Sequence, residues 1–206
     1  MVLGILEKKP NKIACIVLAA GSSIRFGSPK QLAEFDGKSL IQTAIDEANS
    51  SMVDYVFLVL GKSSSEILVH LSLGRAQVVF NKNYQQGIAS SIKCGVSNLP
   101  DDSEAAIIMV ADQPFLRSTH LNMLIQAFKD SPRKIIALAD KGEPRNPVLI
   151  PSEMFTELEN LQGDEGARIM VKKNSGTVLI DIPDFRVFFD VDTKASLLDI
   201  GKSNVT

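Results

Sequence analysis

The chain has 206 residues, 45% of them hydrophobic and 22% charged, with a formal net charge of −2 at pH 7. This composition excludes a disordered chain, and the nearly balanced charge gives no general reason to expect binding to nucleic acid or to a membrane. The length suits one domain, since single domains reach roughly 250 residues.

The sequence also bears on location. No stretch approaches the roughly 20 apolar residues of a membrane span, and residues 1–11 lack the features of a signal peptide. Cys15 and Cys94 lie among apolar or small residues, so we expect reduced thiols in the core. We therefore expect a cytoplasmic protein with an N-terminal extension at 1–11, one domain at 12–200 and a tail at 201–206.

Apolar runs alternate with amphipathic stretches along most of the chain. We predict strands at 12–18, 55–60, 76–80, 105–110 and 134–139, and helices at 38–50, 64–71, 88–99 and 118–129. This succession predicts an α/β domain with a mainly parallel sheet and helices on both faces. Further strands at 147–150, 177–180 and 186–189, with helices at 152–161 and 164–173, predict a mixed C-terminal extension that completes the sheet.

The first predicted strand ends in a basic loop of small residues. It begins Leu18-Ala19-Ala20-Gly21 and continues through Arg25 to Lys30. Backbone N–H groups of such a loop can donate to phosphate oxygens, and two cations add charge that a simple turn does not need. The Walker spacing G-x-x-x-x-G-K-[ST] and the dinucleotide spacing G-x-G-x-x-G are both absent. We therefore expect a triphosphate site of another kind.

Other polar clusters follow later strands, at the edge where open α/β sheets bind ligands. Asn81 follows the third strand and Ser90 opens the next helix, so both are candidates for hydrogen bonds to a base or ribose. Ser90 and Ser91 could equally cap that helix. Asp112 follows the fourth strand and is a candidate ligand for Mg²⁺ bound to substrate phosphates, or else part of an Asp-x-Pro turn.

The last cluster is Asp190-Val191-Asp192-Thr193. Two acids one residue apart on an extended segment point to opposite sides, so we expect only one of them to face the site. Asp192 is either a second metal ligand or the N-cap of the last helix. Arg145 and Arg168 lie in turn-rich segments, and each is either a surface residue or a binding group for a second anionic substrate such as a phosphate monoester.

Together these motifs resemble the nucleotidyltransferases of the molybdenum cofactor pathway, which share a fold with sugar-nucleotide pyrophosphorylases. Residues 18–30 resemble the superfamily signature Leu-Ala-Ala-Gly-Ser-Ser-x-Arg-x-Gly-x-x-Lys. Segments 111–114, 145–148, 163–168 and 190–193 resemble Gly-Asp-Gln-Pro, Arg-Gly-x-Pro-Val, Gly-Asp-x-Gly-Ala-Arg and Asp-x-Asp-Thr of the cytidylyltransferase branch. The resemblance covers nearly the whole chain and implies a single Rossmann-like nucleotidyltransferase domain.

Details of the motifs bear on the branch and on its substrates. The guanylyltransferase relatives typically have Ala-Gly-Gly where this chain has Ala19-Ala20-Gly21, so the resemblance favours CTP. Phe26 stands where methionine is usual, and Ala111 replaces a glycine ahead of the metal acid. Glu143-Pro144 stand before Arg145, where the relatives have a simpler segment with glycine. This difference bears on recognition of the pterin.

The resemblance implies a Mg²⁺-dependent transfer of CMP from CTP to the phosphate of molybdenum-bound molybdopterin, with pyrophosphate leaving. It implies catalytic roles for Arg25, Lys30 and Asp112, and metal binding by Asp112 and Asp192. Nucleotide binding would fall to Leu18, Ala19, Ala20, Gly21, Arg25, Lys30, Asn81, Ser90 and Asp112, and acceptor binding to Arg145 and Arg168. A transient contact with a molybdoenzyme or its chaperone is implied as well.

Two other functions stay open at this point. The same NTP site could serve another phosphorylated or sugar-phosphate acceptor, because acceptor pockets lie in the variable second half of such chains. A non-catalytic nucleotide-binding factor for molybdoenzyme maturation is less favoured. Binding alone would not require both acids and both loop cations.

Overall fold

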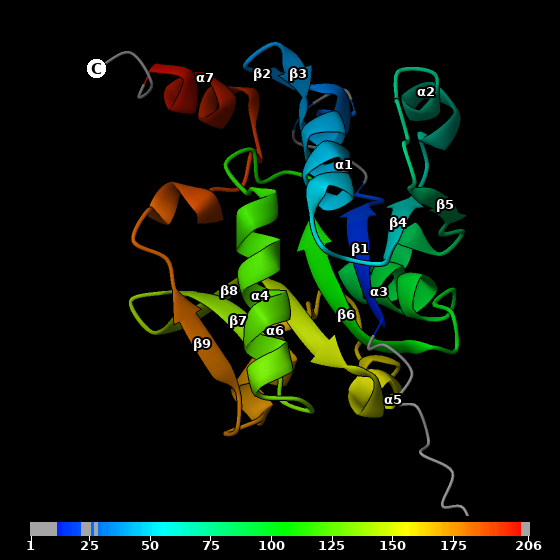
Figure 1. The fold of residues 1–206 in the computed structure, drawn as a ribbon. Coiled ribbons are helices and arrows are strands. Elements are labelled where there is room, and N and C mark those ends of the chain that lie inside the picture. The colour runs from blue at the N-terminus through cyan, green and yellow to red at the C-terminus, as the bar shows by residue number, and fades with distance from the viewer. Residues whose placement is uncertain (1–11, 22–25, 27–28, 203–206) are drawn as a thin grey trace, which may run out of the picture.

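The central strand of the molecule is β1 (Lys12–Ala19), and every residue from Ile13 to Ala19 is buried. The computed structural model describes residues 12–21, 26 and 29–202 (Figure 1). Alternate residues of β1 enter two different apolar clusters: Cys15 lies in one and Ile16 in the other. Because both faces of the strand are covered, its sequence is a continuous apolar run and not an alternating one.

In the described part of the chain, seven strands form one sheet with the order β5-β4-β1-β6-β8-β7-β9. The others are β4 (Tyr55–Leu60), β5 (Gln77–Phe80), β6 (Ser103–Val110), β7 (Ile136–Asp140), β8 (Glu143–Pro151) and β9 (Val178–Asp181). β4, β5 and β6 continue the parallel arrangement of β1, whereas β8 is antiparallel to both β6 and β7. The mainly parallel sheet with a mixed C-terminal extension is therefore confirmed.

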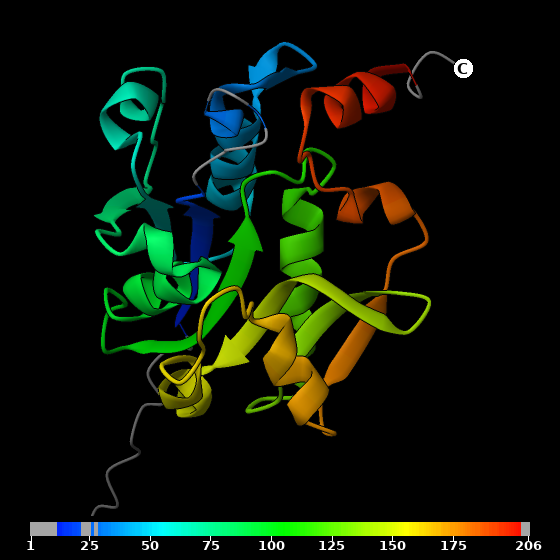
Figure 2. The same cartoon turned by 180° about the vertical axis from the view of Figure 1, so that it is seen from behind.

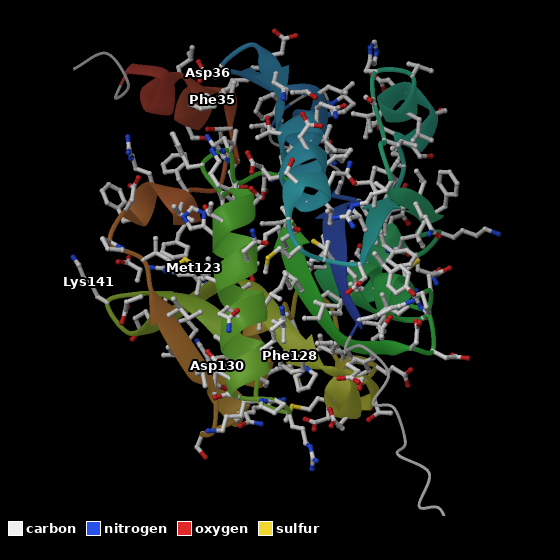
Figure 3. All side chains as sticks on the ribbon, viewed as in Figure 1. Phe35, Asp36, Met123, Phe128, Asp130 and Lys141 are labelled. Carbon is white, nitrogen blue, oxygen red and sulfur yellow. The ribbon has the colours of Figure 1, made fainter. Side chains whose placement is uncertain are left out.

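Helices cover both faces of this sheet (Figures 1 and 2). α1 (Leu40–Ser50), α2 (Ser64–Leu68) and α4 (Ser118–Asp130) pack on one face, and α3 (Ile88–Val96), α5 (Phe155–Leu158) and α6 (Arg168–Lys173) on the other. On α4 the Phe128 side chain is buried while Met123 is exposed (Figure 3). No helix among the described residues combines the length and apolar character needed to cross a membrane.

Shorter elements complete the chain at the two ends of the sheet. They are a hairpin of β2 (Glu34–Phe35) and β3 (Lys38–Ser39), the 3-10 turns η1 (Lys30–Leu32), η2 (Tyr84–Gln86), η3 (Ser152–Met154) and η4 (Phe185–Phe188), and α7 (Lys194–Lys202). Cys15 and Cys94 are free thiols, as predicted; Cys15 is buried and Cys94 is half-buried.

The predicted strand at 186–189 is wrong, because this segment forms the 3-10 turn η4. The Asp184 carboxylate accepts a hydrogen bond from the Arg186 backbone N–H at 3.1 Å, and the Phe189 N–H donates to the Arg186 carbonyl at 3.0 Å. The side chain of Asp184 thus satisfies a backbone donor locally, which favours a turn over a strand. The side chain of Val187 is buried, and in the sequence it resembles one inward-facing residue of a strand.

The helices predicted at 152–161 and 164–173 are shorter than expected. The first is the turn η3 followed by α5, and the second begins only at Arg168. Gly163 has a φ of +53°, a left-handed conformation that interrupts a helix and favours glycine. The residues between α5 and α6 therefore form a loop.

Arg75 fixes the C-terminal end of α1. Its guanidinium donates to the carbonyls of Val53 at 2.5 Å, Ser51 at 3.0 Å and Asn49 at 3.1 Å. These carbonyls lie at or after the last turn of the helix, where partners from the helix itself run out.

Replacing Arg75 with methionine should lower the free energy of unfolding by about 2 kcal/mol, since several carbonyls lose a charged donor at once. Urea unfolding measures the change. Lys82→Met is the matched control, because Lys82 is exposed and makes no ion pair or hydrogen bond with a described residue. Equal unfolding midpoints for the two variants would contradict this role of Arg75.

The parallel strands bring the predicted functional clusters to one edge. β1, β4, β5 and β6 run in the same direction and end at Ala19, Leu60, Phe80 and Val110. This is the upper edge in Figure 1, where the hairpin and α7 also lie. The loops that follow these strands form the candidate site.

Candidate active site

A cavity of about 600 Å³ opens at the carboxyl edge of the parallel strands. Its walls come from the ends of β1 and β6, from the segment that leads into α3, and from the loop before α6. The lining residues are Leu18, Ala19, Ala20, Gly21, Lys30, Gln31, Lys62, Tyr84, Gln85, Gly87, Ile88, Ser91, Val110, Ala111, Asp112 and Asp164. Four residues of the predicted phosphate loop, together with Lys30 and Asp112, thus share one cavity.

A lysine lies between two carboxylates, of which Asp112 lines the cavity and Asp192 does not. The Lys30 Nζ is 2.5 Å from Asp112 Oδ2 and 3.3 Å from Asp192 Oδ1. The side chains of Lys30 and Asp112 are each only 19% exposed. Burial alone would lower the pKa of Lys30, but the two carboxylates outweigh it and raise that pKa above its ordinary value. The three groups form one charged unit drawn from three distant parts of the chain.

The second oxygen of Asp112 is the most informative atom of the site. Asp112 Oδ1 is buried and has no hydrogen-bond partner among the described residues. A buried carboxylate oxygen without a partner is costly, so it indicates a ligand that the protein alone does not supply. In the described part of the chain, no group of three or more His, Cys, Asp or Glu side chains is placed to hold a metal by itself.

This donor set fits a magnesium ion that is shared with a substrate. Mg²⁺ prefers oxygen ligands and is usually held by one or two carboxylates together with phosphate oxygens and water. Asp112 offers one unpartnered oxygen, and Asp192 offers a second carboxylate close to the same lysine. The residues present therefore match a metal bound jointly by protein and phosphates.

The C-terminal segment is tied to the end of β6. The Val191 N–H donates to the Asp112 carbonyl at 3.0 Å, and Gln113 Nε2 donates to Asp190 Oδ1 at 3.0 Å. Partial loss of water and the nearby charge of Asp112 raise the pKa of Asp190, although the Gln113 hydrogen bond opposes this. Asp190 thus binds Gln113 whereas Asp192 contacts Lys30, and the expectation that only one of the two acids faces the site stays a prediction.

The N-cap alternative for Asp192 does not hold. The last helix is capped by its neighbour Thr193, whose Oγ1 accepts from the Ser196 N–H at 3.1 Å. The Ser196 Oγ in turn accepts from the Thr193 N–H at 3.1 Å. The Asp192 carboxylate instead lies 3.3 Å from the Lys30 Nζ.

Two predicted nucleotide-binding residues lie outside the cavity lining. Asn81 is 4% exposed, and its amide donates to Ser90 Oγ at 2.8 Å and to Ser91 Oγ at 3.0 Å. Its oxygen accepts from the Asn83 N–H. Asn81 therefore links the end of β5 to the start of α3, and Ser91 lines the cavity in place of Ser90.

The predicted cations divide into three cases. Arg25 lies outside the described residues. Arg145 is on β8, 3.6 Å from Asp140, with its buried Nε unpartnered, and it does not line the cavity. Arg168 is exposed at the start of α6 and does not line the cavity either. Of these cations, only Lys30 is seen at the predicted phosphate site.

Residues 15–178 match the family described as the MobA-like NTP transferase domain. The chain belongs to this family. The MobA-like match spans the loop after β1 and the acid after β6, and it ends before the C-terminal segment that carries Asp192.

Two curated relatives align with this MobA-like chain over most of their length. Purine catabolism protein PucB of Bacillus subtilis is 28% identical over 190 residues, which is 86% of this chain and 90% of the relative. Nicotine blue oxidoreductase of Paenarthrobacter nicotinovorans is 26% identical over 186 residues, 86% of this chain and 91% of the relative. Each alignment thus covers most of this chain and most of the relative.

A solved structure shares the fold. The complex of Rv0371C with manganese from Mycobacterium tuberculosis H37Rv has a TM-score of 0.79 at 23% identity. It covers 94% of this chain and 100% of the other. The single MobA-like α/β domain therefore has a close counterpart in architecture.

Sequence reasoning missed several residues of the cavity. Gln31 is 5% exposed, and its amide donates to the carbonyls of Ala19 and Gly21, each at 2.9 Å. It thus holds the start of the phosphate loop in place. Its position directly after Lys30 could have suggested this. Nothing in the sequence singles out Lys62, whereas Asp164 belongs to the motif at 163–168, which we used only for the resemblance.

Proposed function

We propose that this MobA-like NTP transferase moves CMP from CTP to the terminal phosphate of molybdenum-bound molybdopterin and releases pyrophosphate. The observation that supports this most strongly is the Lys30–Asp112–Asp192 unit with its unpartnered Asp112 oxygen. It combines a cation for phosphates with carboxylates for a divalent metal at the ligand-binding edge of the sheet.

In this proposal Asp112 and Asp192 would hold Mg²⁺ together with the phosphates of the NTP. A bound Mg²⁺ neutralises charge on the phosphate oxygens. Lys30 now occupies the space between the two carboxylates, and it would turn to the β- and γ-phosphates when the NTP is bound. Arg25, on the same loop, would contact the same phosphates. Manganese in the solved relative makes Mn²⁺ a suitable second ion for experiments.

The transfer depends little on a general base. A phosphate oxygen of the acceptor forms the new bond to the α-phosphorus, while the bond from that phosphorus to the bridging oxygen breaks and pyrophosphate leaves. Because the acceptor phosphate is already an anion, the protein mainly aligns the reactants and stabilises charge. His120 is used elsewhere, since its Nδ1 accepts from the Arg117 N–H at the start of α4.

The identity of the two substrates rests on the motifs. Ala20, which lines the cavity, favours CTP over GTP through the resemblance described above. The cytidylyltransferase-like segments at 111–114, 163–168 and 190–193 favour the molybdopterin acceptor. Arg145 and Arg168 remain proposed acceptor contacts, and each would have to reach the acceptor beyond the cavity wall. A passing contact with a molybdoenzyme or its chaperone would deliver the product.

A transfer assay tests the proposal. The protein is incubated with CTP labelled at the α-phosphate, Mg²⁺ and a panel of acceptors: a phosphorylated pterin, sugar phosphates and no acceptor. We expect label in a new pyrophosphate-linked product only with the phosphorylated pterin, and none after chelation of the metal. Transfer to a sugar phosphate would favour the other acceptor class. Binding of CTP without transfer would favour the non-catalytic maturation factor.

A further inference from the structure

The contacts proposed for the substrate leave its nucleoside end without a recognition group. Asn81 and Ser90 satisfy each other and lie outside the cavity lining. The wall formed by the segment leading into α3 carries Tyr84, Gln85 and Ser91, and one charged residue, Asp164, joins it from the loop before α6. Asp164 is therefore a candidate for a group that recognises the nucleoside.

Packing at Gly87 fixes the place of Asp164. Gly87 has a φ of +86°, and a Cβ there would lie 2.2 Å from the Gly163 carbonyl oxygen and 2.7 Å from Asp164 Oδ1. The Ala89 N–H donates to the same Gly163 carbonyl at 3.1 Å. The loop that contains Asp164 thus lies directly against the first residues of α3, and only glycine at position 87 allows this approach.

The Asp164 carboxylate has no partner among the residues that the structure describes. It makes no hydrogen bond or ion pair with a described residue, although Lys62 lines the same cavity. The adjacent acid differs, because Glu165 accepts a hydrogen bond from the Gln162 N–H at 2.9 Å and does not line the cavity. An ionised carboxylate only accepts hydrogen bonds, so a ligand opposite Asp164 has to present a donor.

We propose that Asp164 determines the base specificity of this site by accepting a hydrogen bond from the exocyclic amino group of cytosine. This inference rests on the proposed NTP transfer and names the residue that distinguishes CTP from UTP. Uracil carries a carbonyl oxygen where cytosine carries the amino group. A carboxylate facing that oxygen would be repelled and left without a donor, which disfavours UTP.

The test compares binding of CTP and UTP, each with Mg²⁺, by isothermal titration calorimetry. The variants are Asp164→Asn and, as matched control, Glu165→Gln, which makes the same change of charge in the same loop. For the wild type we expect CTP to bind at least about tenfold more tightly than UTP. Asp164→Asn should reduce this ratio about tenfold, because an amide can donate to the uracil oxygen. Glu165→Gln should leave the ratio unchanged.

A ligand without the 2′-hydroxyl separates base recognition from ribose recognition. With 2′-deoxy-CTP we expect the same effect of Asp164→Asn as with CTP. If the substitution ceased to matter for 2′-deoxy-CTP, or if it weakened CTP and UTP equally, the inference would be overturned while the proposed function stood. If the wild type bound neither nucleotide, the proposed function would fail together with it.

Discussion

Replacing Asp112 with alanine is expected to lower kcat of the proposed transfer by about 1,000-fold, the largest effect of any substitution considered. The variant loses the unpartnered Oδ1, which is the best candidate for a metal contact. It also loses the carboxylate that pairs with Lys30. Metal-assisted charge stabilisation contributes several kcal/mol to such reactions, and each 1.36 kcal/mol corresponds to tenfold in rate.

The fold of this variant should persist. Lys30 keeps Asp192 as a partner and the site remains accessible to water, so the free energy of unfolding should change by only about 1 kcal/mol. Asp46→Asn is the control, since Asp46 forms an exposed pair with Lys38 away from the site. Urea unfolding and steady-state rates measure the two quantities separately. Near-normal turnover of Asp112→Ala would remove Asp112 from the metal site.

Replacing Lys30 with methionine is expected to weaken binding of the NTP about 30-fold. Lys30 is the one described cation that lies at both the phosphate loop and the carboxylates, and a charged hydrogen bond to phosphate contributes roughly 1.5–3 kcal/mol. The loss should appear mainly in Kd and KM, because a phosphate contact made before transfer also stabilises the ground state.

Calorimetric titration with CTP and Mg²⁺ measures this effect. Lys93→Met serves as control, because Lys93 is a half-buried cation on α3 that lies outside the cavity lining. A second effect is expected on binding of the metal. Because the variant lacks the positive charge between Asp112 and Asp192, it should bind Mg²⁺ alone more tightly. Unchanged NTP binding would remove Lys30 from the phosphate site.

Most of the fold could be predicted from the sequence because its signals are local and strong. The strands around β1 are apolar runs covered on both faces, and each stands out from the amphipathic helix that follows it. The prediction failed at 186–189, where one buried side chain, Val187, sits in a capped turn. A single apolar contact cannot distinguish a short strand from a 3-10 turn.

The candidate site could be predicted only in part, for a related reason. Lys30 and Asp112 follow strands directly, so strand direction alone brings them to the same edge. Asn81 also follows a strand, but its side chain turns inward to the serines of α3, and the sequence gives no sign of that direction. Asp164 reaches the cavity through the close approach of Gly163 to Gly87, a tertiary contact between distant segments.

The most direct test of the account is identification of the product that forms from CTP and a phosphorylated pterin. Phosphorus NMR of that reaction, with Mg²⁺ present, follows the α-phosphorus of CTP. We expect a new diphosphate linkage between CMP and the acceptor phosphate together with equimolar pyrophosphate, and neither signal from Asp112→Ala over the same reaction time. Release of inorganic phosphate in place of pyrophosphate, or equal product formation by Asp112→Ala, would contradict it.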